Sequence, residues 1–315
     1  MNRKAVIFGI KGTILSDKEK IFLKKHKPWG VILFSRNIEN IFQLKYLISN
    51  IRNCLKDDKY PILIDQEGGQ VSRLNKILDL RKFSQAYFGK LYTKNKIFFY
   101  KAYEDYVNKI SKIFKFVGIN INTVPVLDVK RLKSHSVIGS RSFSKNSKIV
   151  SEMGSLCIKL FEKNKIGTVM KHIPGHGLAT VDSHKKKPII NASQKKLKNI
   201  DFKPFKACKS FFAMTAHIVY SAYDTKFCAT QSKIVIKKVI RRYIGFSGIL
   251  ISDDISMKAL KFGLKNNAFK ASKAGCNLIL HCNGNIREMK EVVKKVPKID
   301  KFTQKKTSHF YKFLG

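Results

Sequence analysis

Short apolar segments rich in β-branched residues alternate along the chain with longer segments in which apolar residues recur every three or four positions. The short segments predict eight strands, at 5–9, 30–34, 61–65, 119–124, 166–171, 212–217, 248–253 and 277–281. The helical period marks 37–56, 97–116, 146–164, 232–244 and 262–274. Strands that are apolar throughout and alternate with helices indicate a parallel sheet covered on both of its faces.

The number of strands predicts the architecture. Eight parallel strands with intervening helices would close a TIM (β/α)8-type barrel of the α/β class. A doubly wound open sheet is the alternative, because periodicity alone does not show closure. We find no internal repeat, no Pro- or Ser-rich linker and no break in composition, so residues 1–315 are expected to form one domain. The Lys-rich tail, about 297–315, is expected to be a terminal helix.

Composition narrows the class of protein. The chain has 315 residues, 44% of them hydrophobic, with only 18 Gly and 7 Pro, which suits a sizeable core and not a fibrous or disordered chain. No apolar run approaches the ~18–20 residues needed to cross a bilayer. The basic start, Met1–Lys4, leads into an apolar stretch that ends at Lys11 without a small-residue cleavage site. We therefore expect a cytosolic protein without a secretory leader.

The six cysteines are scattered, and no two of them form a Cys-x-x-Cys pair. This pattern predicts reduced thiols, most of them small core residues, and argues against a disulfide framework or a zinc ribbon.

The formal net charge of +42 is the unusual feature of the composition. Such a charge suggests a polyanionic partner such as nucleic acid. Compositional drift is the alternative, because Lys, Ile, Asn and Phe are abundant together and only ten of the 63 basic residues are Arg, the better phosphate ligand. We favour drift and expect no nucleic-acid partner, because the lysines are spread along the chain. In so basic a chain the 21 acidic residues are candidates for functional roles. Helix capping and solubility are the competing explanations for their presence.

Polar residues gather where the predicted strands end. Asp65 ends the third strand, and Lys171 and His172 follow Val169-Met170. His217 and the pair Asp253-Asp254 occupy the same place in two later strands. Barrel enzymes assemble their active sites from several strands at this carboxyl end, so these side chains are expected to share one face. The alternative is chance combined with helix capping, since Asp is a good N-cap.

The segment 64–73 carries Asp65 and Arg73 on either side of paired glycines, which allow a tight turn. The two side chains could face one cleft and offer sugar hydroxyls an acceptor and a fork of donors. A structural turn is the alternative.

A long loop begins at Lys171 and contains three histidines. A metal site is disfavoured, because Pro and Gly break any helical His-x-x-x-His pair and no Cys or Glu lies nearby. Asp182 and His184, two positions apart, could instead form a carboxylate–imidazole pair, with His184 giving and taking a proton near neutral pH. A solvated loop pair is the alternative.

Asp253 and Asp254 end the seventh predicted strand. A carboxylate held at a strand terminus suits a nucleophile that must approach a carbon closely, and the second Asp could cap the next helix. A carboxylate nucleophile, a separate acid/base and a hydroxyl-binding rim together describe a retaining glycosidase.

Seven motifs occur in order along the chain: IDQEGGQVSRL, GININTVPVLDV, VIGSRSFS, KHIPGHGLATVDSHKKKP, MTAHIVYSAYD, ATQSK and GFSGILISDDISMKAL. From about Trp29 to Ala274 the chain resembles the β-N-acetylhexosaminidases of glycoside hydrolase family 3. It is most similar to the single-domain cytosolic members that act in bacterial peptidoglycan recycling. The resemblance implies a TIM barrel that removes non-reducing N-acetylglucosamine from 1,6-anhydro-muropeptides through a covalent glycosyl-enzyme, and hence a role in cell-wall turnover.

The resemblance also implies the roles of individual residues. It makes Asp253 the nucleophile and His184 the proton donor and acceptor, with Asp182 as the partner that orients His184. It implies sugar binding by five residues: Asp65, Arg73, Arg141, Lys171 and His172. It implies no metal or organic cofactor, and we expect a monomer whose partner is a small muropeptide.

This sequence departs from the family at Gln70, Ile173 and Leu178, where Arg, Phe and Asp are usual. None of the departures removes a catalytic group, but Leu178 puts loop packing and rate in question. Three rival functions remain: a catalytically weakened polyanion-binding barrel, a family 3 β-glycosidase of different sugar specificity, and a metal hydrolase that uses the loop histidines.

Overall fold

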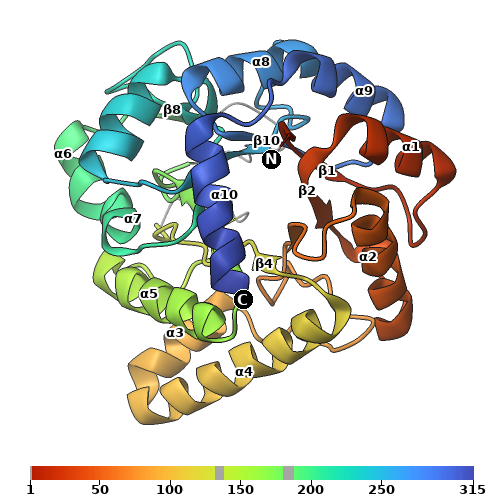
Figure 1. Ribbon diagram of the computed structural model, residues 1–315. Helices are drawn as coiled ribbons and strands as arrows, with labels where there is room; N and C mark the ends of the chain where they lie inside the picture. The colour runs from red at the N-terminus through yellow and green to blue at the C-terminus, as the bar shows by residue number, and fades with distance from the viewer. Residues whose placement is uncertain (1, 132–137, 180–187) are drawn as a thin grey trace.

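The computed structural model describes residues 2–131, 138–179 and 188–315, and in this part of the chain eight parallel strands close into a barrel (Figure 1). The barrel strands are β1 (Lys4–Gly9), β2 (Pro28–Leu33), β3 (Ile62–Ile64), β4 (Ile121–Asn122), β5 (Gly167–Ile173), β7 (Phe212–Thr215), β9 (Ile249–Asp254) and β10 (Leu278–His281). Their order around the barrel is β1-β10-β9-β7-β5-β4-β3-β2, with every neighbouring pair parallel. All eight predicted strands are confirmed, and closure excludes the doubly wound alternative.

Helices surround the barrel (Figure 1). The α-helices are α1 (Asp17–His26), α2 (Ile41–Leu55), α3 (Gln85–Lys94), α4 (Lys96–Val117), α5 (Ser147–Lys163), α6 (Gln194–Lys196), α7 (Lys203–Ala207), α8 (Leu264–Ala274), α9 (Ile286–Lys295) and α10 (Lys301–Leu314). Two π-helices, η3 (Leu197–Asp201) and η5 (Val235–Tyr243), and three 3-10 turns, η1 (Ser35–Asn37), η2 (Gly139–Arg141) and η4 (Ala229–Gln231), complete the set in the described ranges.

The helical period found α2, α4, α5 and α8, but it missed other helices. The predicted helix 232–244 is of the π type over Val235–Tyr243. Helix α1 was not predicted, although Ser16 and Glu19 form a capping box at its start. Charged residues dominate α1 and α9, so the apolar period in them is short.

A second small sheet escaped the sequence pattern. It pairs β6 (Ile189–Ile190) with β8 (Val219–Tyr220) in parallel, outside the barrel. A strand of two residues has too few positions to show a period.

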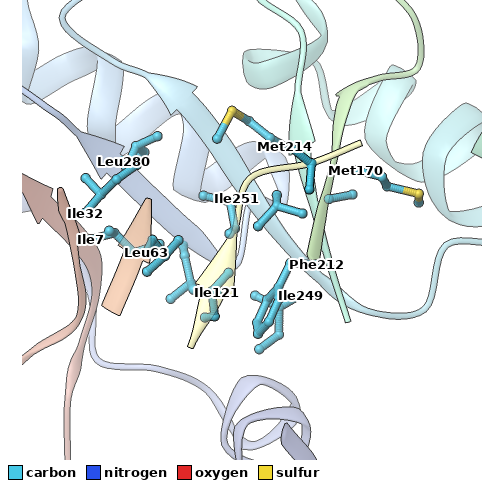
Figure 2. Packing of buried hydrophobic residues seen from close by; sticks show 14 of the residues in the cluster. Ile7, Ile32, Leu63, Ile121, Met170, Phe212, Met214, Ile249, Ile251 and Leu280 are labelled. Atoms are coloured by element: carbon cyan, nitrogen blue, oxygen red, sulfur yellow. The ribbon is translucent and has the colours of Figure 1, made fainter. Parts of the chain in front are cut away.

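The interior of the barrel is a packed hydrophobic core. Side chains from seven strands meet there (Figure 2): Ile7, Ile32, Leu63, Ile121, Phe212, Met214, Ile249, Ile251 and Leu280. Each of these side chains is buried. The barrel is therefore filled, and ligands can be bound only at its ends.

Helix α10 closes the amino-terminal end of the barrel (Figure 1). The indole Nε1 of Trp29 in β2 donates to Thr307 Oγ1 at 2.9 Å. The ring of Phe310 packs edge-on against Phe212 of β7 with centroids 5.0 Å apart. The prediction of a terminal helix in the Lys-rich tail is confirmed, and the opposite end of the barrel is left for a site.

Two further expectations can be compared with the described residues. None of the helices they form is both long and apolar enough to span a membrane. Four of the six cysteines, Cys157, Cys208, Cys228 and Cys276, are buried, as predicted for small core residues.

Candidate active site

A cavity of about 160 Å³ lies at the carboxyl ends of the barrel strands. Six of the predicted site residues line it: Asp65, Arg73, Arg141, Lys171, His172 and Asp253. They come from the ends of β3, β5 and β9 and from the loops that follow β3 and β4. Closure of the barrel therefore gathers side chains that the sequence places far apart.

Asp65 is held by two cations and a hydroxyl group. Its Oδ1 accepts from the Nζ of Lys171 and, at 2.5 Å, from Thr123 Oγ1, and its Oδ2 accepts from Arg73 Nη2 at 2.9 Å. Burial by itself raises the pKa of Asp65, but the charges of Lys171 and Arg73 outweigh burial and hold that pKa well below its usual range. Asp65 is thus an ionised acceptor at neutral pH, with two fixed donors beside it.

Glu67 is a buried carboxylate that the sequence analysis did not select. It accepts two hydrogen bonds from Arg141, both at 2.8 Å, and its Oε1 lies 2.7 Å from Lys171 Nζ. Burial by itself raises the pKa of Glu67, but Arg141 and Lys171 outweigh burial and lower it. This bidentate ion pair fixes the orientation of the Arg141 guanidinium plane. Glu67 lies in the same Gly-Gly motif as Asp65, and this proximity in the sequence could have marked it as a candidate site residue.

Asp128, also not selected, orients His172. Its Oδ2 lies 2.7 Å from Nδ1 of His172, and its Oδ1 accepts from the backbone N–H groups of His172 (3.3 Å) and His176 (2.6 Å). Burial by itself raises the pKa of Asp128, but His172 outweighs burial and lowers it. An ionised Asp128 accepts hydrogen bonds only, so Nδ1 of His172 carries the proton. The other ring nitrogen, Nε2, lies 3.4 Å from Arg141 Nη2 at the cavity.

The two aspartates that end β9 have different surroundings. Asp254 accepts from Ser256 Oγ at 2.7 Å and from the Ser256 N–H at 3.1 Å, which stabilises the turn after the strand. The predicted N-cap is wrong, because the next helix begins at Leu264 after Gly263 and has no side-chain cap. Asp253 Oδ1 accepts from the backbone N–H of Asp254 at 2.8 Å, and both residues line the cavity.

His217, also predicted at this end of the barrel, does not line the cavity. It is fully buried, with Nδ1 2.7 Å from Thr230 Oγ1 and Nε2 2.9 Å from the backbone oxygen of Asp254. Its contact with the Asp254 backbone holds the end of β9 in place.

Apolar side chains form part of the cavity wall. Phe34, Met214, Met257 and Leu280 line it. The guanidinium of Arg73 lies 5.5 Å from the centroid of the Phe34 ring. An apolar wall with a few fixed polar groups is typical of small-molecule sites.

Two of the predicted catalytic residues, Asp182 and His184, lie outside the described residues.

The three departures from the family pattern lie within the described residues, and their surroundings differ. Ile173 is buried in β5, Leu178 packs against the core, and Gln70 is exposed.

The loop histidines within the described ranges bear on metal binding. The rings of His172 and His176 have centroids 5.7 Å apart. Burial lowers the pKa of His176 to about 4, so it is neutral at pH 7. The same ranges contain no group of three or more His, Cys, Asp and Glu residues placed to hold a metal ion.

Comparison with known proteins shows the family of the chain. The model of the glycosyl hydrolase family 3 N-terminal domain matches residues 8–308. A β-hexosaminidase of Neisseria meningitidis serogroup C (strain 053442) is 33% identical over 290 residues, which are 89% of this chain and 78% of that protein. The β-hexosaminidase of Nitrosomonas eutropha is 30% identical over 283 residues, 88% of this chain and 80% of that protein.

Among solved structures, NagZ from Neisseria gonorrhoeae in complex with N-trifluoroacetyl-D-glucosamine superposes with a TM-score of 0.87 at 29% identity. The match covers 100% of this chain and 90% of that chain. The family model, the relatives and the barrel lead to one conclusion: the chain belongs to glycosyl hydrolase family 3.

Proposed function

We propose that the protein is a retaining β-N-acetylhexosaminidase that removes terminal β-linked N-acetylglucosamine. The observation that carries the proposal is the Asp253 carboxylate at the end of β9, in the same cavity as a set of fixed hydrogen-bonding groups. The names of the similar proteins, β-hexosaminidases among them, support the choice of sugar.

The proposed chemistry has two steps. In the first, Asp253 attacks the anomeric carbon and forms a covalent glycosyl-enzyme as the leaving oxygen is protonated. In the second, a water molecule that has been deprotonated by the acid/base releases the sugar with retained configuration. The polar groups around Asp253 hold the sugar hydroxyls: Asp65, Arg73, Arg141, Lys171 and His172.

The protonation states of three carboxylates at this end of the barrel favour an imidazole as the acid/base. Asp65, Glu67 and Asp128 all have pKa values below their usual range, because neighbouring cations outweigh burial. A carboxyl group that stays ionised at neutral pH is a poor proton donor. We therefore assign proton transfer to His184, oriented by Asp182.

The proposed substrate is a muropeptide whose non-reducing end is N-acetylglucosamine, and the proposed place of action is the cytosol, in cell-wall recycling. The amphipathic cavity supports a sugar ligand, because apolar side chains can contact the C–H faces of a sugar while ionic groups bind its hydroxyls.

The test traps the intermediate. A mechanism-based 2-acetamido-5-fluoro glycoside is incubated with the protein, and the modified peptide is located by mass spectrometry. We expect one label, on Asp253, and none in Asp253→Asn. Asp254→Asn is the matched control, because Asp254 lines the same cavity but its carboxylate is bonded to Ser256 in a turn, and this variant should still be labelled on Asp253. A label on Asp254 or Asp65, or no label, would refute the assignment. An aryl β-glucoside turned over as fast as the aryl N-acetylglucosaminide would refute the sugar preference.

A further inference from the structure

A groove of about 1090 Å³ lies on the outside of the barrel, away from the cavity described above. One wall is α1, and the other is α9 together with the start of α8 and the two residues before it. Figure 1 shows α1 and α9 as neighbours at the edge of the barrel. On α1 the lining residues lie at 18, 21, 22, 25 and 26, and on α9 they lie at 286, 287, 288, 290, 291 and 294. Each helix therefore presents one face over about two turns, roughly 11–12 Å.

The floor of the groove is apolar and is partly open to solvent. Phe22 is buried, and Leu264 and Ile286 are half-buried. Ile21 and Phe262 are 67% and 44% exposed at the edges. Large apolar side chains that gather in a concave surface indicate an interaction site more strongly than apolar side chains scattered singly.

The rim of the groove is cationic. Six Lys and Arg residues line the groove, against two carboxylates, Glu288 and Glu291. Both carboxylates are already engaged: Glu288 pairs with His281, and Glu291 pairs with Lys265 and Lys294. Four cations, Lys18, Lys25, Arg287 and Lys290, form no ion pair with any carboxylate of the described ranges.

These charges affect the pKa of a half-buried histidine, His26, that also lines the groove. Burial lowers the pKa of His26, and Lys25, Lys4 and Lys290 lower it further. The groove thus combines an apolar floor with uncompensated positive charge.

We propose that this groove is a docking site for an acidic amphipathic helix of a partner protein. Apolar residues of the helix, spaced i, i+4, i+7, would lie on the floor, and its acidic residues would meet the lysines of the rim. A second copy of this chain is disfavoured, because each copy carries a net charge of +42. A flat lipid surface does not enter a concave groove, whereas a rod-shaped helix does.

The test uses the full-length protein and a fluorescent synthetic peptide of 14 residues. The peptide has Leu at i, i+4, i+7 and i+11 and Glu or Ala elsewhere, and a second peptide has Lys in place of every Glu. We expect saturable binding of the Glu peptide by fluorescence anisotropy, weaker binding as salt rises, and no binding of the Lys peptide.

Two pairs of variants locate the site. Ile21→Glu and Lys25→Glu change the groove, and each should weaken binding about tenfold or more. Ile14→Glu and Lys24→Glu make the same changes at exposed positions that do not line the groove, and they should leave binding within about twofold. All four should retain the glycosidase activity of the unsubstituted protein.

Four outcomes would overturn the proposal. They are no saturation up to about 1 mM peptide, equal loss of binding in groove and control variants, equal binding of the Lys peptide, and self-association in sedimentation that Ile21→Glu abolishes.

Discussion

Removing the buried carboxylate of Glu67 should lower the free energy of unfolding by several kcal/mol. Its side chain is 1% exposed and joins Lys171 to Arg141, whose side chains are 2% and 12% exposed. Removing one partner of a buried ion pair costs about 3–5 kcal/mol. Because the amide of Gln keeps one acceptor oxygen, we expect Glu67→Gln to lower the free energy of unfolding by about 3 kcal/mol. With 315 residues, the unfolding entropy is roughly 0.7 kcal/mol/K, so Tm should fall by about 4–5 °C.

The dependence on pH gives a second measure of the same group. The folded-state pKa of Glu67 lies below its ordinary value of 4.5, so ionised Glu67 contributes stability above that pH. This contribution is lost as pH falls through the folded-state pKa. The difference in Tm between the unsubstituted protein and Glu67→Gln should therefore be full at pH 7 and shrink below about pH 4.5.

The matched control is Glu104→Gln, which makes the same substitution in an exposed pair. Lys163 and Glu104 are 2.9 Å apart, with side chains 70% and 41% exposed, and such pairs contribute about 0–1 kcal/mol. The assay is thermal unfolding followed by circular dichroism, together with kcat/KM on an aryl N-acetylglucosaminide. Glu67 also positions two proposed sugar-binding cations, so kcat/KM should fall about 100-fold. A Tm shift no larger than that of Glu104→Gln would refute the reasoning.

Three further predictions concern other groups. Asp253→Asn should abolish turnover of an aryl N-acetylglucosaminide with Tm unchanged within about 2 °C, and full activity of this variant would contradict the assignment. His184→Ala should spare the first step for substrates with good leaving groups, so the glycosyl-enzyme should accumulate and appear as a burst of released phenol. Asp128→Asn should lower kcat/KM about 10- to 150-fold, because the amide no longer fixes the proton on Nδ1 of His172 and one charged hydrogen bond is worth about 1.5–3 kcal/mol; unchanged steady-state kinetics would show that this hydrogen bond does not orient the ring. Burial raises the pKa of Asp201 to about 6, so its ionisation should reduce stability as pH rises from about 4 to 6, and Asp201→Asn should gain in Tm relative to the unsubstituted protein over that window; parallel pH profiles of the two proteins would rule this out.

The sequence determined which segments become barrel strands and where most polar site residues stand along them. Both follow from local rules: a strand buried on both faces must be apolar throughout, and a polar residue at its end marks the edge of the sheet. Asp65, Lys171, His172 and Asp253 were found in this way, and each lines the cavity. The catalytic roles of Asp253, Asp182 and His184 remain predictions.

The tertiary structure decided which charges become partners. Glu67 and Asp128 are ordinary acidic residues in the sequence, and only the closed barrel brings them against Arg141, Lys171 and His172. The same holds for Asp254, whose neighbours make it a turn residue instead of a helix cap.

Periodicity alone left closure open, because the pairing of β1 with β10 joins strands from opposite ends of the chain; the predicted barrel rested on the number of strands and on the family resemblance. Periodicity records how each residue meets its near neighbours along the chain. The energies of burial and of charge pairing depend instead on contacts between residues distant in sequence, so they become definite only when the fold forms.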